Sequence, residues 1–122
     1  MLSYSIEEIK EKATPIAERY GIDSLTLFGS YARGDADENS DLDFYVGKGS
    51  FGSLFEHSSF ILDLEETFGC RVDVVVLSAI QNQDFYNEIT KEGIRLYERN
   101  TLTESVPVLK NQISELLMKF EE

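Results

Sequence analysis

The chain has 122 residues, of which 42% are hydrophobic and 28% are charged, a balance typical of one soluble globular domain. Its 11 basic and 23 acidic residues give a net charge of −12. Because nucleic-acid binding relies on Lys and Arg to neutralise phosphates, this charge argues against a template-using polymerase or a tRNA-tailing enzyme. It is compatible with a nucleotide that arrives as a metal complex, with a basic protein partner, or simply with solubility.

The sequence carries no signal for a membrane or for secretion. No apolar stretch approaches the roughly 18–20 residues of a membrane span. The N-terminus lacks the basic start and the apolar centre of a signal peptide. Cys70 is the single cysteine, so an intrachain disulfide is excluded, and we expect it to be a small core residue. We therefore expect a cytoplasmic protein.

Apolar periodicity and turn residues predict helices and strands that alternate along the chain. Ser5 is expected to cap the first helix, with Glu8 completing a capping box, and Gly21 is expected to end it. In chain order the predicted elements are a helix over residues 5–20, a strand over 25–28, a helical turn over 30–33, a loop over 34–40, a strand over 41–46, a flexible stretch over 47–52, a helix over 53–68, a strand over 71–77, a helix over 80–90 and a short edge strand over 93–98.

Residues 29–43 combine a glycine-serine turn with two acids on the strand that follows. Gly29 and Ser30 end an apolar strand, and such a turn offers backbone N–H groups and a hydroxyl to a phosphate. Asp41 and Asp43 project from the same face of their strand. Two carboxylates this close repel each other unless a proton or a cation such as Mg²⁺ lies between them. The segment therefore predicts phosphoryl or nucleotidyl transfer.

A third acid interrupts the almost wholly β-branched strand over 71–77. Because an unpaired buried carboxylate costs several kcal/mol, Asp73 is expected either at the end of the sheet or beside the cation of Asp41 and Asp43. Along the strand over 41–46 the side chains should alternate between the two faces. The inward residues should be Leu42, Phe44 and Val46, and the outward residues should be Asp41, Asp43 and Tyr45.

The glycine-serine pair, the ten residues after it, Asp41, Asp43 and the later Asp73 together resemble the DNA polymerase β-type nucleotidyltransferase superfamily. The residues from Gly29 to Gly34 also resemble the minimal nucleotidyltransferases (MNT), the antitoxin halves of HEPN/MNT toxin–antitoxin pairs. The resemblance covers about residues 5–99. It implies an α/β (α+β) fold, a small mixed β-sheet flanked by helices, with the nucleotidyltransferase domain over residues 1–100.

The resemblance also implies a metal site. In the family pattern Asp41 and Asp43 hold two Mg²⁺ ions, for which Mn²⁺ can substitute. Asp73 completes the coordination of the ion nearest the attacking hydroxyl and helps to deprotonate that hydroxyl. Ser40 is assigned to the nucleotide site through its ordering of the loop that enters the strand.

The remaining marked residues are assigned to the triphosphate of ATP. Gly29 permits close approach of a phosphate, and Ser30 is expected to hydrogen-bond it. Arg33 lies one helical turn beyond Ser30 and is expected to brace the β- or γ-phosphate or the leaving pyrophosphate. The alternative for Arg33 is a salt bridge to Asp35 or Asp37.

The length of the chain narrows the choice of acceptor substrate. Relatives that modify antibiotics or tRNA use further domains to hold their acceptor, whereas this chain has about twenty residues beyond its core. The resemblance therefore favours an MNT antitoxin that transfers AMP from ATP to a tyrosine of a partner HEPN-domain ribonuclease toxin, without a nucleic-acid template. The alternatives are an antitoxin that acts by binding alone and a small-molecule nucleotidyltransferase of the antibiotic type.

Residues 101–122 lie beyond the resemblance. They place the following apolar residues on one helical face: Val106, Leu109, Ile113, Leu116, Leu117 and Phe120. Such a C-terminal amphipathic helix either packs back on its own domain or contacts a partner or a second copy of the chain.

Overall fold

The computed structural model of the protein describes residues 3–47 and 50–99. Helices and strands follow one another as predicted, and the C-terminal helix expected over 101–122 lies outside the described residues. In chain order the elements are α1 (Ile6–Tyr20), β1 (Ser24–Phe28), α2 (Ser30–Arg33), β2 (Leu42–Val46), α3 (Leu54–Phe68), β3 (Val72–Val76), the short 3₁₀ helix η1 (Leu77–Ala79), α4 (Gln83–Glu92) and β4 (Ile94–Glu98).

The four strands form one mixed sheet in the order β3-β2-β1-β4. β1 pairs antiparallel with β2 and with β4, whereas β2 and β3 are parallel. β4 is an edge strand, as predicted, and β3 forms the other edge. The register aligns Phe28, Asp43 and Asp73 in one row across β1, β2 and β3. The sheet therefore brings residues from three separate segments side by side.

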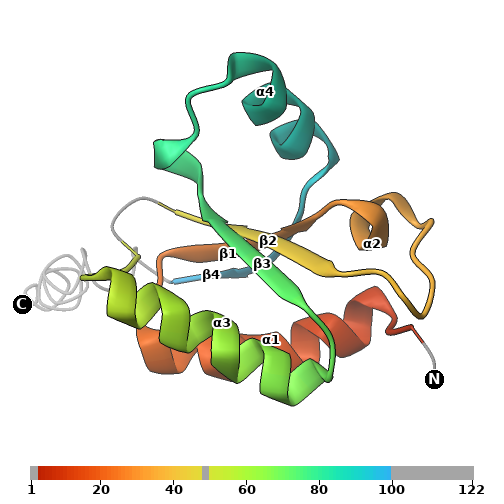
Figure 1. The fold of residues 1–122 in the computed structure, drawn as a ribbon, viewed down its shortest axis with the longest axis horizontal. Helices are drawn as coiled ribbons and strands as arrows, with labels where there is room; N and C mark the ends of the chain where they lie inside the picture. Colours follow the sequence, from red (N-terminus) through yellow and green to blue (C-terminus); the bar gives the residue numbers. More distant parts are fainter. Residues whose placement is uncertain (1–2, 48–49, 100–122) are drawn as a thin grey trace, which may run out of the picture.

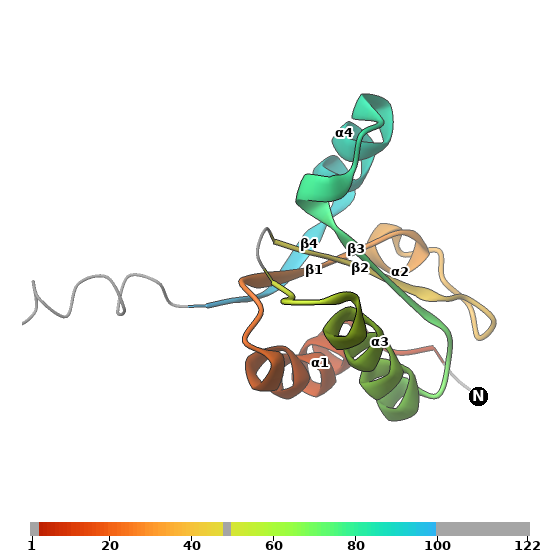
Figure 2. The same ribbon diagram turned by 60° about the vertical axis from the view of Figure 1, so that its left-hand side comes forward.

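Helices α1 and α3 lie together on one face of the sheet, and α4 stands on the opposite face (Figures 1 and 2). The predicted capping box begins α1: the Ser5 hydroxyl accepts from the backbone N–H of Glu8, whose carboxylate accepts from the Ser5 N–H. α1 and α3 bury their apolar stripes, and the inward residues of β2 contribute Leu42, Phe44 and Val46 to the same core. No helix within the described ranges is long and apolar enough to cross a membrane.

The opposite face of the sheet has a smaller core beneath α4. Ile89 of α4 packs there against Phe28 and Tyr45. Tyr45 shares the face of Asp43, as the alternation predicts, but it is buried rather than outward because α4 covers it. The helix predicted over 80–90 is observed as α4 over Gln83–Glu92. Residues 77–79 form η1 instead, and Asn82 caps α4 by accepting from the N–H of Phe85.

Candidate active site

The turn after β1 lies directly against an acid of β2. Gly29 has φ +80°, a conformation that residues with a side chain rarely adopt. A Cβ at this position would lie 3.1 Å from Cγ of Asp43 and would overlap its carboxylate oxygen Oδ2. Glycine is therefore required twice, by its backbone conformation and by the carboxylate beside it. The predicted phosphate turn and the predicted metal ligand are in contact.

The three predicted acids form a cluster of negative charge. Asp43 lies in β2 directly opposite Asp73 of β3, and Asp41 comes just before β2 begins. Partial burial, and then repulsion by Asp73 and Asp41, raise the pKa of Asp43 from 3.8 to about 6. Asp73 lies on the edge strand β3 and is exposed. The sheet thus brings the acids close enough to disturb one another.

The chemistry of these donors fits a hard divalent cation. Carboxylate oxygens are the ligands that Mg²⁺ prefers, and in residues 3–47 and 50–99 no hydrogen bond or ion pair neutralises Asp41, Asp43 or Asp73. The same part of the chain gathers no three His, Cys, Asp or Glu side chains into a ready coordination shell. The charge therefore fits a cation, and the assignment of the three aspartates as ligands stays a prediction.

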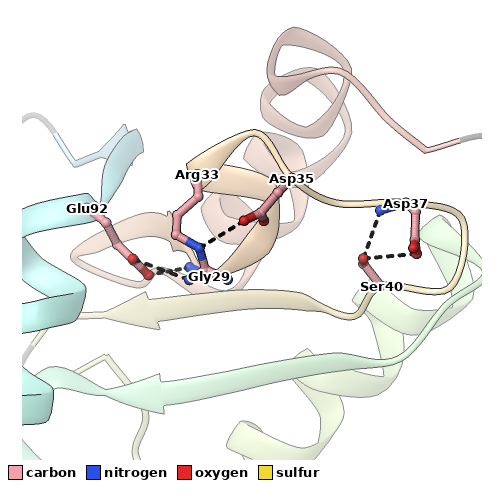
Figure 3. A network of polar contacts seen from close by, with 6 residues as sticks. All are labelled: Gly29, Arg33, Asp35, Asp37, Ser40 and Glu92. Atoms are coloured by element: carbon pink, nitrogen blue, oxygen red, sulfur yellow. Dashed lines mark hydrogen bonds and ion pairs between the residues drawn. The ribbon is translucent and has the colours of Figure 1, made fainter.

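Arg33 is paired with two acids. Its Nε lies 3.4 Å from Oδ2 of Asp35, and its Nη1 lies 3.4 Å from Oε1 of Glu92 (Figure 3). The contact with Asp35 is the alternative that the sequence left open. Arg33 projects from α2 beside the glycine turn, so the cation predicted to brace a phosphate is held next to the turn by carboxylates.

Glu92 is a residue of this site that the sequence analysis missed. Its Oε2 accepts a hydrogen bond of 2.7 Å from the N–H of Gly29, 63 residues away in sequence (Figure 3). It comes from the last residue of α4. Burial of an acid at this helix terminus depends on tertiary packing, and the only local signal is a glutamate directly before Gly93, where the helix stops.

The two predicted serines differ in their surroundings. Ser30 is the first residue of α2, and its hydroxyl has no hydrogen-bond partner among the described residues. Ser40 lies in the loop, where its hydroxyl accepts from the N–H of Asp37 at 2.9 Å and lies 3.3 Å from Oδ1 of Asp37 (Figure 3). Ser40 therefore orders the loop that enters β2. The predicted role of either serine toward a nucleotide stays a prediction.

Two other reactive side chains serve the structure. Nε2 of His57 donates to the backbone carbonyl of Val74 at 2.7 Å, and the half-buried imidazole stacks on Phe51. Burial raises the pKa of the Cys70 thiol, which therefore stays protonated and is a poor nucleophile. This surrounding agrees with the core role that the sequence predicted for Cys70.

The sequence of the chain is similar to known nucleotidyltransferases. Residues 11–102 match the family described as polymerase beta, nucleotidyltransferase. A protein of Methanocaldococcus jannaschii, provisionally named a protein adenylyltransferase, is 40% identical over 76 residues, which are 62% of this chain and 82% of that protein. The protein adenylyltransferase MntA of Thermococcus cleftensis is 35% identical over 86 residues, which are 67% of this chain and 87% of MntA.

Solved structures share the fold. One provisionally identified as a minimal nucleotidyltransferase superposes with a TM-score of 0.62 at 29% identity, covering 75% of this chain and 95% of that one. A toxin–antitoxin structure with AMP-PNP gives 0.64 at 17% identity, covering 92% and 95%. A complex of a tri-AMPylated Shewanella oneidensis HEPN toxin with its MNT antitoxin gives 0.59 at 15% identity, covering 94% and 95%. The predicted fold is confirmed, and the chain belongs to the polymerase beta nucleotidyltransferase family.

Proposed function

We propose that the protein is an ATP- and Mg²⁺-dependent protein adenylyltransferase that acts as an antitoxin, transferring AMP to a tyrosine of a HEPN-domain ribonuclease toxin in the cytoplasm. The observation that carries this proposal is the contact between the Gly29 turn and the Asp43 carboxylate, with Asp73 in the same row. A phosphate-binding turn in contact with a cation site suits a reaction at the α-phosphate of a nucleoside triphosphate.

In the proposed reaction the phenol oxygen of the tyrosine attacks the α-phosphorus of ATP. The bond from this phosphorus to the bridging oxygen breaks, and pyrophosphate leaves. Asp73 accepts the phenol proton, because it is the exposed acid of the row and can face an incoming acceptor. Ser30 and Arg33 hold the triphosphate. Bound Mg²⁺ would neutralise the phosphate charge, and Asp41 and Asp43 would hold it.

The relatives support the choice of acceptor. Both named relatives carry the name protein adenylyltransferase, and the chain covers most of their length. One structure with the same fold is an MNT antitoxin bound to an AMPylated HEPN toxin. The names of these relatives and the composition of that complex support a separate protein as the acceptor.

A second candidate is an antitoxin that silences its partner by binding alone. The observation that favours it is that no three potential ligands within the described ranges form a ready metal site. The two functions differ in what the aspartates do. Replacing Asp41 and Asp43 with asparagine removes two negative charges and leaves the size of both side chains almost unchanged.

The test measures toxin ribonuclease activity and toxin mass together. The toxin is incubated with ATP, Mg²⁺ and either the wild-type chain or the variant Asp41→Asn/Asp43→Asn. A catalytic antitoxin produces an inactive toxin heavier by one or more AMP groups, and the variant produces neither change. An unmodified toxin that is silenced equally by both proteins would contradict the proposal and favour binding alone.

A further inference from the structure

Glu92 contacts two groups beside the turn that could otherwise bind a phosphate. They are the N–H of Gly29, one of the backbone donors of the turn, and Arg33, which the proposed function assigns to the triphosphate. Each of the two carboxylate oxygens of Glu92 contacts one of these groups: Oε2 accepts from the Gly29 N–H at 2.7 Å, and Oε1 lies 3.4 Å from Nη1 of Arg33 (Figure 3). A carboxylate that binds a backbone N–H and a guanidinium presents the same kind of charge and oxygen ligands as a phosphate. The side chain of Glu92 therefore makes the contacts that a phosphate oxygen could make at the same two groups.

This position is unfavourable for an acid in three respects. Glu92 is in the last turn of α4, where the helix dipole disfavours negative charge. Its side chain is only 16% exposed, so that it is poorly hydrated. It also repels Asp43, and the cluster of aspartates is already crowded with negative charge. The Gly29 N–H and Arg33 are the contacts that compensate.

The packing of α4 fixes the place from which Glu92 reaches the turn. Ile89, one turn earlier, is buried against Phe28 and Tyr45. A Cβ on Gly93, directly after Glu92, would lie 2.8 Å from Cγ2 of Thr26, so that the helix end is pressed close to the sheet. The backbone of Glu92 is therefore fixed, while its side chain has three rotatable bonds through which the carboxylate can turn away.

We propose that Glu92 is a built-in competitor of the triphosphate, which holds the Gly29 amide and Arg33 in the free protein and must turn aside when a nucleotide binds. This inference rests on the proposed function and adds a residue that sets the affinity for nucleotide. A single N–H donates one strong hydrogen bond, so Glu92 and a phosphate oxygen cannot both have it. Their like charges oppose joint occupancy of Arg33 as well.

Binding by Glu92→Gln tests the proposal. Glutamine keeps the length of the side chain and one acceptor oxygen but loses the charge, so it competes less well with a phosphate. The matched control is Glu88→Gln, which removes the same charge from an exposed position on α4. Calorimetry measures binding of three ligands to each protein: AMP-PNP with Mg²⁺, inorganic tripolyphosphate with Mg²⁺, and adenosine.

We expect Glu92→Gln to bind AMP-PNP and tripolyphosphate about five-fold more tightly or better. A charge-assisted hydrogen bond is about twice as strong as a neutral one, and the difference of about 1 kcal/mol corresponds to about five-fold in Kd. Adenosine has no phosphate and should show no gain, and Glu88→Gln should resemble the wild type with every ligand. Equal or weaker binding of both phosphate ligands by Glu92→Gln would overturn the competitor role. Weaker binding would make Glu92 a residue that positions Arg33 for the phosphate.

A second measurement uses the wild-type chain and needs no variant to fold. Carboxyl carbon resonances are followed by NMR while AMP-PNP and Mg²⁺ are added, together with the amide resonance of Gly29. Both the Glu92 Cδ and the Gly29 amide resonances should move with the same midpoint. Saturation by nucleotide with an unmoved Glu92 resonance would refute displacement and leave the proposed function standing. Failure of the wild type and both variants to bind any phosphate ligand would overturn the competitor role and the proposed function together.

Discussion

Replacing Asp43 with asparagine is expected to stabilise the metal-free protein, although the same change should abolish transfer. Burial and the neighbouring Asp73 and Asp41 raise the pKa of Asp43 to about 6. An acid whose pKa is raised on folding binds a proton more strongly in the folded state than in the unfolded state. Stability is therefore lost as the pH rises from about 4 to about 6, and the loss stays constant above that range.

The size of this effect follows from the pKa. A rise from 3.8 to about 6 corresponds to about 3 kcal/mol at full strength, since each factor of ten in proton affinity is worth about 1.4 kcal/mol. Asp43 is only partly buried, so solvent screening reduces the cost to about 1–2 kcal/mol. In a domain of this size that difference raises the melting temperature by about 3–8 °C.

The assay is thermal unfolding of the wild type and Asp43→Asn in EDTA at several pH values between 4 and 8. Glu88→Gln serves as the control, because it removes one charge from an exposed position away from the cluster. The melting temperature of Asp43→Asn should exceed that of the wild type at pH 8, and the two should converge toward pH 4. Equal melting temperatures at pH 8, or a less stable variant there, would refute the charge-cluster account of Asp43.

Three further changes separate the roles within the site. Asp73→Asn should reduce the transfer rate at saturating nucleotide by at least about 100-fold, while nucleotide affinity falls only modestly. Lost affinity with normal turnover would show that Asp73 does not face the acceptor hydroxyl. Ser30→Ala should raise KM for ATP by about ten-fold or more and leave KM for the toxin unchanged, as expected for one charge-assisted hydrogen bond to phosphate; a change confined to the toxin would place Ser30 on the other substrate. Gly29→Ala should lower stability by about 2 kcal/mol or more and weaken nucleotide binding, because its Cβ would overlap the Asp43 carboxylate; a variant as stable as the wild type in chemical denaturation would argue against that contact.

Much of the fold could be predicted because its signals are local. The capping box of Ser5 and Glu8 lies within four residues, and the alternation along 41–46 assigns the faces of β2 correctly. The phosphate turn and the acids of residues 29–43 were predicted from one short segment, and the antiparallel return of β2 along β1 places Asp43 beside Gly29. A structure that is determined by residues within one turn or one hairpin can therefore be predicted from the sequence.

The remaining features depend on how distant elements pack. Tyr45 is buried only because α4 packs on that face of the sheet. The alternation of residues along β2 assigns Tyr45 to this face but does not show that a helix covers it. Glu92 reaches Gly29 across 63 residues, so no spacing along the chain marks the pair. The start of α4 at Gln83 rather than at 80 follows from η1 and the cap at Asn82.

The most direct test of the central claim follows the phosphorus atoms of ATP. The HEPN toxin is incubated with the wild-type chain, Mg²⁺ and ATP labelled at either the α- or the γ-phosphate, and covalently bound label is then measured on the toxin and localised by peptide mass spectrometry. Nucleotidyl transfer predicts that the α-label appears on a toxin tyrosine, that the γ-label does not, and that EDTA or Asp41→Asn/Asp43→Asn removes the signal. Transfer of the γ-label, or no label on the toxin while the wild-type chain still silences it, would contradict the account.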